Sequence, residues 1–421
     1  MPLGHPGVLS RGHGPSVRRR RGRAAATAEG RATMRVALVH SFYGMASPSG
    51  ENEAVRLQAE ALQRAGHEVR LIAAHTDERA DRPLYALRSA ATVATGRGRS
   101  PLPMLREAAP HLVHVHNLFP NFGRSWVRRW PGPLVATLHN FRPLCAGATL
   151  YRDGAPCTSC PAGDRWAGLR HGCYRDSRLA TLPLAWAGRH GLAGDPLVAR
   201  ADRLVLLSDM CRDTYVRAGV APRRAALIPN FVPDGPWSLK PGKGWVFVGR
   251  LSPEKGIQEL LRLWPADEPL DVIGDGPLSA PCRAEAPAGV RFLGALPHSE
   301  VRALLPKHAG LVFPSLCAEG APLVYLEALA AGLPVLALRG SAVSQAVDAQ
   351  NTGRVIGWDE PLSAVLRDSS AAFPGLRLHC RDIYEQHYSE SVWSSRMTEL
   401  YRELTRHQNG PAQEISGGVA K

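Results

Sequence analysis

The sequence lacks long hydrophobic runs and has few cysteines for its length. No stretch of about 20 apolar residues occurs in the 421-residue chain, which excludes a bilayer-spanning helix. The most apolar segment, residues 179–192, is broken by Arg189 and His190 and suits at most an interfacial contact. Eight cysteines are too few for a disulfide-built domain of this size. With 44% hydrophobic and 21% charged residues, the chain is predicted to fold as two globular domains.

Several cofactor and phosphate motifs are also missing. No G-x-G-x-x-G follows the first predicted strand, which disfavours a nicotinamide enzyme, and there is no Walker A loop. The sequence has no D-x-D, so nothing obvious would hold Mg²⁺ on a diphosphate. A diphosphate ligand would therefore depend on Arg, Lys and helix N-termini, and no catalytic cofactor is expected.

Positive charge is concentrated in the first half of the chain. The net charge is +14; residues 34–238 hold 26 Arg and 16 acidic residues, whereas residues 239–421 hold 18 basic and 20 acidic ones. A basic half predicts an anionic partner such as a membrane surface or a phosphate-bearing substrate. The 46 Arg against 5 Lys indicate that a coding bias explains part of the excess. No basic stripe is interleaved with aromatics, so a nucleic-acid partner is not expected.

The chain ends differ from the folded part. Residues 1–33 contain seven Arg and one Glu, and no apolar segment follows the run at 18–21, so they resemble neither a secretory nor a twin-Arg signal. We predict a disordered Arg-rich leader over 1–33, a flexible tail over 407–421 and a cytoplasmic protein, with peripheral attachment to the inner face of the membrane as a further expectation.

Short apolar runs alternate with helical patterns from Met34 onward. The order strand, loop, helix, strand over residues 35–73 is a βαβ unit and predicts a parallel sheet. A Pro- and Gly-rich stretch at 233–244 is the expected interdomain linker. The predicted strands begin at residues 35, 68, 112, 134, 203 and 226 before the linker, and at residues 245, 270, 290, 311 and 334 after it.

This pattern predicts an α/β fold of two doubly wound Rossmann-like domains facing each other across a cleft. The domains are expected at 34–235, with a Cys-rich insertion at 145–173, and at 236–385. A helix at 386–406 is expected to pack back on the first domain. Sheets of this kind bind ligands at the carboxyl ends of their strands.

Residues 313–335 are the most informative segment. A strand ends at Pro314, a loop carries Glu319, and a helix containing Glu327 begins near Pro322. Backbone N–H groups at this helix start offer an anion site, and the two carboxylates could bind sugar hydroxyls on either side of a diphosphate. Spacing alone also fits a loop or cap residue at Glu319 and a solvated helix face at Glu327.

Further candidates follow other predicted strands. Gly249 and Arg250 through Lys255 place two cations at a strand end, where they could neutralise a diphosphate or simply form a charged surface loop. Asp275 lies in a Gly-Asp-Gly-Pro turn, and Gly50 lies in a loop suited to close backbone approach. Of the strand histidines 114, 116 and 139, His139 is the one expected to point toward the cleft.

Four cysteines fall in the insertion, at the spacing C-x11-C-x2-C-x12-C. Cys145, Cys157, Cys160 and Cys173 permit a closed, structural zinc site, which would brace a long loop. With one C-x2-C knuckle the match is incomplete, and reduced or redox-labile thiols remain the alternative. The other four cysteines are expected to be ordinary buried thiols.

Taken together, these motifs resemble retaining glycosyltransferase family 4, of GT-B fold (glycosyl transferases group 1). The resemblance rests on the opening MRVALVHSFYGMASPSGENEAV, LVHVHNLFP, TLHNFRPLC, GRLSPEKG, IGDGP and the E-x7-E of Glu319 and Glu327. It covers about residues 34–406. One departure is Ala321, where members often carry an aromatic residue or glycine, which leaves the donor sugar open.

The resemblance implies a role for each matching residue. Glu319 would contact donor-sugar hydroxyls, Glu327 the ribose, and Arg250 with Lys255 the diphosphate. His139 would lie beside the sugar and Gly50 near the diphosphate or acceptor. The implied donor-binding residues are Glu327, Gly50, Gly249, Asp275, Gly320, Ala321, Pro322 and Leu323.

The expected activity is transfer of a sugar from a nucleotide-diphosphate donor to a lipid-linked or saccharide acceptor with retention, in cell-surface polysaccharide or glycolipid synthesis. The N-terminal domain would bind the acceptor and the C-terminal domain the nucleotide sugar. A nucleotide-sugar epimerase of the same fold and a non-catalytic sugar-nucleotide-binding protein remain alternatives. An epimerase requires proton-abstracting carboxylates in the N-terminal half, and the sequence singles out none.

Overall fold

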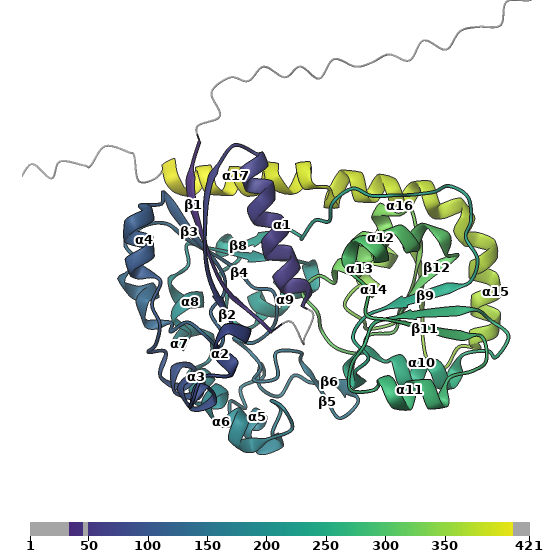
Figure 1. Cartoon of the computed structure of the whole chain (residues 1–421), viewed down its shortest axis with the longest axis horizontal. Helices are drawn as coiled ribbons and strands as arrows, with labels where there is room; N and C mark the ends of the chain where they lie inside the picture. Colours follow the sequence, from purple (N-terminus) through teal and green to yellow (C-terminus); the bar gives the residue numbers. More distant parts are fainter. Residues whose placement is uncertain (1–32, 45–48, 407–421) are drawn as a thin grey trace, which may run out of the picture. The chain divides into compact units, whose positions relative to one another are not determined.

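A computed structural model describes residues 33–44 and 49–406 (Figure 1). The disordered leader predicted over 1–33 and the flexible tail predicted over 407–421 lie outside these ranges, apart from Thr33. Across the described residues, none of the helices combines the length and the apolarity that crossing a bilayer requires.

The N-terminal half is built on a six-stranded parallel sheet of order β2-β1-β3-β4-β7-β8. Its inner strands read as near-continuous apolar runs because helices cover both faces of a parallel sheet, whereas the edge strand β2 is largely exposed. In β1, seven consecutive residues from Val36 onward are buried. The strands are β1 (Arg35–Phe42), β2 (Glu68–His75), β3 (Leu112–Asn117), β4 (Leu134–Thr137), β7 (Arg203–Leu206) and β8 (Ala225–Leu227).

Helices of this half follow the expected pattern of one apolar face. In α1 (Gly50–Arg64) the buried residues Ala54, Leu57, Ala61 and Leu62 recur at helical spacing. The other helices are α2 (Asp77–Ala80), α3 (Tyr85–Thr95), α4 (Leu102–Ala108), η1 (Ser125–Arg129), α5 (Ala167–His171), α6 (Arg178–Gly188), α7 (Gly191–Gly194), α8 (Pro196–Arg200), α9 (Asp209–Arg217) and η2 (Pro222–Arg224). A short hairpin, β5 (Tyr151–Arg152) and β6 (Ala155–Pro156), lies in the Cys-rich insertion.

The C-terminal half repeats the plan with a second parallel sheet of order β11-β10-β9-β12-β13-β14. Its strands are β9 (Trp245–Val248), β10 (Leu270–Ile273), β11 (Val290–Gly294), β12 (Gly310–Phe313), β13 (Val335–Leu338) and β14 (Gly353–Ile356). The predicted pair of doubly wound domains is therefore confirmed. Strand β14 was not predicted, because Gly353 and Arg354 leave only two consecutive apolar residues in it.

Helices of this half connect its successive strands, and several more follow the last strand, β14, without another strand between them. They are η3 (Pro253–Lys255), α10 (Ile257–Leu263), α11 (Ser279–Glu285), α12 (His298–Leu304), η4 (Leu305–Lys307), α13 (Leu323–Ala330), α14 (Ser344–Ala349), α15 (Leu362–Ala372), η5 (Phe373–Leu376), α16 (Arg377–Ile383), the π-helical turn η6 (Tyr384–Tyr388) and α17 (Glu390–Arg406).

The last helix, α17, belongs to the core of the first half. Trp393, Met397 and Tyr401 are buried in one apolar cluster with Leu38 and Leu62. The hydroxyl of Tyr401 lies 2.6 Å from His114 Nδ1, and Figure 1 shows α17 running past α1. Residues far apart in sequence thus complete one core.

Candidate functional site

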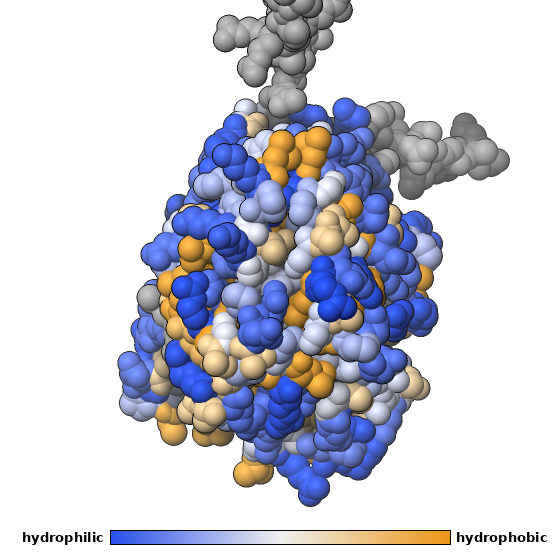
Figure 2. Space-filling model, turned by 90° about the vertical axis from the view of Figure 1, so that its right-hand side faces the viewer, coloured by the Kyte–Doolittle hydropathy of each residue, from blue (hydrophilic) through white to orange (hydrophobic). Residues whose placement is uncertain are grey.

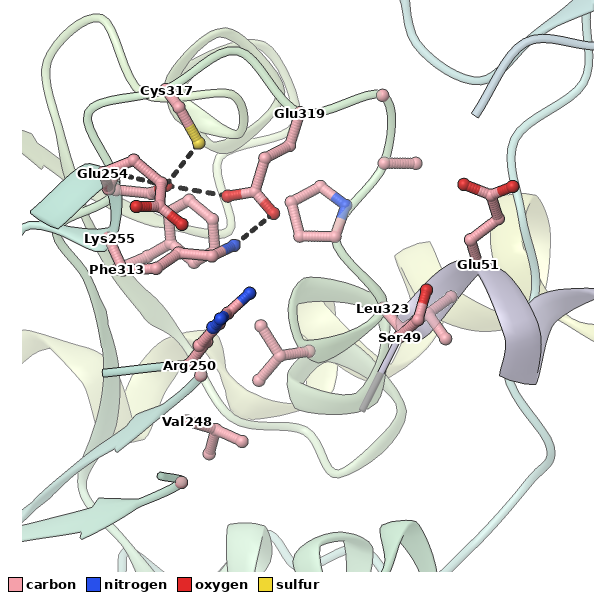
Figure 3. A pocket seen from close by; sticks show the side chains of 18 of the residues that line it. Ser49, Glu51, Val248, Arg250, Glu254, Lys255, Phe313, Cys317, Glu319 and Leu323 are labelled. Carbon is pink, nitrogen blue, oxygen red and sulfur yellow. Dashed lines mark hydrogen bonds and ion pairs between the residues drawn. The ribbon is translucent and has the colours of Figure 1, made fainter. Parts of the chain in front are cut away.

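A cleft of about 970 Å³ is lined by loops from both sheets. Those loops follow the carboxyl ends of β1 and β4 in one half, and of β9, β10 and β12 in the other. This is the place where parallel sheets bind ligands, because successive crossovers leave a crevice there. Figure 3 shows charged side chains from several of these loops entering the cleft.

An ion pair between Lys255 and Glu319 lies in the cleft wall. Lys255 Nζ is 2.6 Å from Glu319 Oε2, and Ser315 Oγ donates to Glu319 Oε1 over 2.7 Å. Burial is the largest effect and would lower the pKa of Lys255, but the charge and hydrogen bond of Glu319, together with Cys317 and Glu254, leave this pKa raised, so the ammonium stays charged. Both oxygens of Glu319 are held by donors, which fixes the carboxylate in one orientation.

A glycine makes this pairing sterically feasible. Gly256 has φ +68°, a left-handed conformation that L side chains rarely adopt. A Cβ placed there would lie 2.2 Å from the carbonyl oxygen of Pro314. The loop after β9 therefore packs directly on the loop after β12, and this contact brings Lys255 to Glu319.

Arg250 adds a second cation beside that pair. Its side chain is exposed, lines the cleft and lies near Lys255 and Glu319 in Figure 3. The preceding Gly249 donates its backbone N–H to Ile273, which anchors this loop to the neighbouring strand. The predicted cations at the strand end are thus brought to one place.

Glu327 lies in α13 and is buried. Its side chain is 3% exposed, so the alternative that it lies on a solvated helix face is wrong. Oε1 lies 3.0 Å from His298 Nδ1 and 3.6 Å from an Arg302 guanidinium nitrogen, both from α12. The hydrogen bond with Glu327 raises the pKa of His298, against a smaller opposing effect of burial.

The loop before α13 approaches the N-terminal half. A Cβ on Gly320 would lie 2.7 Å from the carbonyl oxygen of His139, so only glycine permits this distance. Ala321 and Pro322 follow in the cleft wall, and Pro322 is the residue directly before the helix rather than part of its first turn. Helix α13 begins at Leu323, with its N-terminal N–H groups at the cleft.

His139 lies at the cleft end of a buried row of histidines. Its Nε2 is 3.0 Å from His116 Nδ1, and the pKa of both rings is lowered by burial. His114, next in the row, lies between Tyr401 and Thr137 and is a satisfied core residue. Of the strand histidines it is His139 that lines the cleft, as expected, in its neutral form.

Two other residues predicted to bind the donor, Asp275 and Gly50, also line the cleft. Asp275 is exposed, and its Oδ1 accepts from Gly276 N over 2.7 Å and from the Ser279 hydroxyl, so the carboxylate bonds within its own turn. A Cβ on Gly50 would be 3.7 Å from Leu323 Cδ1, which places the start of α1 against the start of α13.

One carboxylate in the cleft was missed by the sequence analysis. Glu51 is the second residue of α1, and its Oε2 accepts from Asn140 Nδ2 over 3.1 Å. Burial raises its pKa to about 7, against the opposing effects of Arg142 and Asn140. The signal was its place directly after the first strand's Gly/Ser/Pro loop, where a cap-like acidic residue is common and so carries little weight.

The four cysteines of the insertion come together around one small cavity. Cys145, Cys157, Cys160 and Cys173 line a space of about 10 Å³, and all are free thiols. Burial, then proximity to the other cysteines, raises the pKa of Cys173. As placed, the described side chains form no group of three or more ligands that could hold a metal ion. The remaining cysteines 211, 282, 317 and 380 are buried, as expected.

Two family models match the chain. "Glycosyltransferase Family 4" matches residues 48–235 and "Glycosyl transferases group 1" matches residues 242–366. Together they cover most of the described chain, one in each half. The protein belongs to the family 4 glycosyltransferases, and the predicted family is confirmed.

Solved structures with the same architecture show the fold. Sucrose-phosphate synthase from Thermosynechococcus elongatus is 18% identical with a TM-score of 0.62, over 89% of this chain and 100% of that one. HepE of Anabaena in complex with UDP is 16% identical with a TM-score of 0.56, over 88% and 100%. These likenesses confirm the GT-B arrangement of two Rossmann-like domains.

A curated relative shares part of the sequence. An exopolysaccharide phosphotransferase of Streptomyces coelicolor is 34% identical over 168 residues, which are 35% of this chain and 17% of that protein. The match therefore spans less than a fifth of the relative.

Proposed function

We propose that the protein transfers a sugar from a nucleotide-diphosphate donor to a saccharide or lipid-linked acceptor, with retention of anomeric configuration. One observation carries the proposal. Two cations, Arg250 and Lys255, line the same cleft as the N-terminus of α13, and the carboxylates Glu319 and Glu327 stand on either side. This arrangement matches a diphosphate with a sugar at one end and a ribose at the other.

Each part of the donor has a partner of suitable chemistry. The N-terminal N–H groups of α13, Arg250 and Lys255 would bind the diphosphate. Glu319, held by Lys255 and Ser315, would accept hydrogen bonds from donor-sugar hydroxyls. Glu327, buried beside His298, would accept from the ribose.

The transfer step needs stabilisation of the departing diphosphate. The bond from the anomeric carbon to the phosphate oxygen breaks as the bond from that carbon to the acceptor oxygen forms on the same face. The acceptor's proton passes to the departing phosphate oxygen, whose charge Arg250 and Lys255 stabilise. Neutral His139 would lie beside the sugar, where it adds no opposing charge.

The biological setting is inferred from the relatives. One of them is named for exopolysaccharide chemistry, and one solved neighbour, HepE, is described in complex with UDP-glucose. We therefore propose a role in cell-surface polysaccharide or glycolipid synthesis, and we further propose a cytoplasmic protein with peripheral attachment to the membrane. UDP sugars are the first donors to test.

A ligand panel tests the donor site. Melting temperature is measured with ADP, GDP, UDP, dTDP and their sugar conjugates, followed by product analysis of any conjugate that binds. A rise with one nucleotide diphosphate is expected, because a ligand that binds the folded state stabilises it. No rise with any member would contradict the proposal, and binding without consumption when acceptors are supplied would favour the non-catalytic alternative.

An epimerase is the second candidate, and Glu51 is the observation that favours it. An epimerase of this fold needs a carboxylate in the N-terminal half, and Glu51 lines the cleft with a raised pKa near 7. The two functions differ in one requirement, since epimerisation needs no acceptor. Conversion of the donor to its epimer in the absence of acceptor would replace the transferase proposal.

Membrane attachment is proposed for the surface of α3 and α6. In α6 the exposed residues Leu179, Leu182 and Trp186 are 85%, 44% and 48% exposed and recur at helical spacing on one face. Arg189 lies 4.3 Å from the Trp186 ring centroid. Helix α3 packs against α6, and its Leu87 is 66% exposed. Apolar side chains flanked by arginines suit the interface of an anionic bilayer.

Vesicle binding checks this surface. We expect sedimentation with phosphatidylglycerol vesicles to exceed that with phosphatidylcholine, and the variant Leu179→Glu/Trp186→Glu to lose most of it. Leu378→Glu, which changes an exposed leucine of α16, is the matched control. Figure 2 shows a different side of the molecule, the right-hand side of Figure 1, where apolar groups are scattered among hydrophilic ones. Equal sedimentation of both variants would contradict the assignment.

A structural zinc ion is proposed for the four cysteines of the insertion. The proposal rests on the small cavity that these free thiols line; a zinc ion would require them to draw together into tetrahedral thiolate ligands, because as placed the described side chains form no ligand group for a metal. We expect about one zinc per chain by elemental analysis, lost in Cys160→Ser, while Cys282→Ser keeps it. A metal-free wild type with four titratable thiols in this segment would favour the alternative of reduced thiols.

A further inference from the structure

Glu51 has an unused hydrogen-bonding atom inside the cleft wall. Its Oε1 is buried and meets the geometry of a hydrogen bond with none of the described residues, whereas its Oε2 is bonded to Asn140; the Asn117 side chain lies near enough to oppose the rise of its pKa. A buried carboxylate oxygen without a donor is costly, and such a group in a binding cleft points to a missing ligand donor. The raised pKa has the same origin, because burial disfavours the charged form.

The Glu51 carboxylate is held in place by Asn140, which lies in the loop after β4. Asn140 Oδ1 accepts from the backbone N–H of Arg142 over 3.0 Å, so its amide nitrogen is the atom turned toward Glu51. The backbone oxygen of Asn140 also accepts from Tyr215 over 2.7 Å. Asn140 is thereby fixed at both ends, which makes Glu51 part of a built site rather than a free surface acid.

The position of Glu51 is close to the donor site. A Cβ placed on Gly50, its neighbour, would lie 3.7 Å from Leu323 at the start of α13. His139, the neighbour of Asn140, lies against Gly320. Two cross-cleft contacts therefore flank Glu51, and Figure 3 shows it on the side of the cleft away from Lys255 and Glu319. A group bound there would face the sugar of a donor bound at α13.

We infer that Glu51 binds the acceptor, accepting a hydrogen bond at Oε1 from a hydroxyl next to the attacking one on a saccharide acceptor. The inference rests on the proposed function and adds the acceptor class to it. Glu51 takes no proton in the transfer, since the proton of the attacking hydroxyl goes to the departing phosphate oxygen. Arg142, whose buried Nε has no partner among the described residues, is the neighbouring donor for an acceptor oxygen. Neighbouring hydroxyls of a saccharide can supply both partners, one donating a hydrogen bond to Glu51 and the other accepting one from Arg142.

The charged form of Glu51 gives the acceptor site a pH dependence. The charged and titratable groups that face it are Arg142 and Tyr43, and burial raises the pKa of Tyr43, so the phenol stays neutral near pH 7. Acceptor binding should therefore weaken as the pH falls through about 7 and Glu51 becomes protonated.

The variant Glu51→Gln tests the inference. It keeps the bond to Asn140 through the amide oxygen but places a donor where Oε1 was. With the nucleotide sugar found in the panel, and p-nitrophenyl glucoside, galactoside and mannoside as acceptor probes, we expect the acceptor KM to rise about 10- to 100-fold. The pH dependence of KM should disappear, while nucleotide-diphosphate binding and acceptor-free donor hydrolysis stay within about twofold of wild type.

Glu60→Gln, an exposed residue of the same helix, is the matched control and should behave as wild type. Because an amide replaces a buried carboxylate, Glu51→Gln should melt at or above the wild-type temperature at pH 8, which separates this role from a structural one. An unchanged acceptor KM, loss of donor binding, or a wild type that hydrolyses donor but accepts none of the three probes would each overturn the inference. If wild type neither binds nor consumes a nucleotide sugar, the proposed function fails instead.

Discussion

Lys255→Ala should lower the rate of sugar transfer about 10²- to 10³-fold, the usual loss when one group that stabilises developing charge is removed from an active site. Lys255 is half-buried against Glu319, and it would stabilise the departing diphosphate together with Arg250. Steady-state assays of nucleotide release with saturating acceptor would measure the loss.

The matched control is Lys243→Ala, which removes an exposed lysine of the interdomain linker. Lys255→Ala also leaves Glu319 without its cation, so some loss of stability is expected. The double variant Lys255→Met/Glu319→Gln removes both charges and should recover stability without recovering transfer. Full activity in Lys255→Ala, or recovery of activity in the double variant, would contradict the assigned role.

Arg377→Met should destabilise the C-terminal half by about 3–5 kcal/mol, the range found when one partner of a buried charged network is removed. The guanidinium is fully buried and donates to three carbonyl oxygens: Ser238 at 2.7 Å, Pro306 at 2.9 Å and His308 at 3.1 Å. Methionine fills the space but leaves three buried acceptors without a donor. Urea unfolding followed by tryptophan fluorescence would measure the change.

Arg367→Met, at an exposed position of α15, serves as the control and should change stability by less than about 0.5 kcal/mol. A similarly small effect for Arg377→Met would show that water or local rearrangement satisfies these carbonyls. Arg377 ties the interdomain linker, η4 and α16 together. Its removal should therefore act on the half that would hold the donor.

The alternation of apolar runs with helical patterns in the sequence was enough to predict the two-domain α/β architecture. Each predicted strand is present, and the inner strands read as apolar runs because a parallel sheet buries them on both faces. Strand β14 was missed because Gly353 and Arg354 leave only two consecutive apolar residues in it. The small elements of the Cys-rich insertion were missed because turns and side-chain clusters, rather than periodicity, determine them.

The candidate site was predictable where local sequence fixes geometry. Lys255, Glu319 and Glu327 follow strand ends or lie in a helix, and the parallel sheet brings them to one edge. The burial of Glu327 was not predictable, because it depends on α12, which contributes His298 and Arg302 from another part of the chain. Glu51 was missed for the same reason, since the Asn140 contact joins residues 89 positions apart.

The attachment of α17 to the first half has a consequence for biosynthesis. A ribosome makes the N-terminal sheet first, but Trp393, Met397 and Tyr401, which complete its core, are added only after the whole second sheet. Until then, Leu62 and Phe231 lack the apolar neighbours that α17 supplies. The core of the half that is synthesised first is therefore completed last. Until α17 has been synthesised and has packed, the nascent chain leaves an apolar groove of this half uncovered.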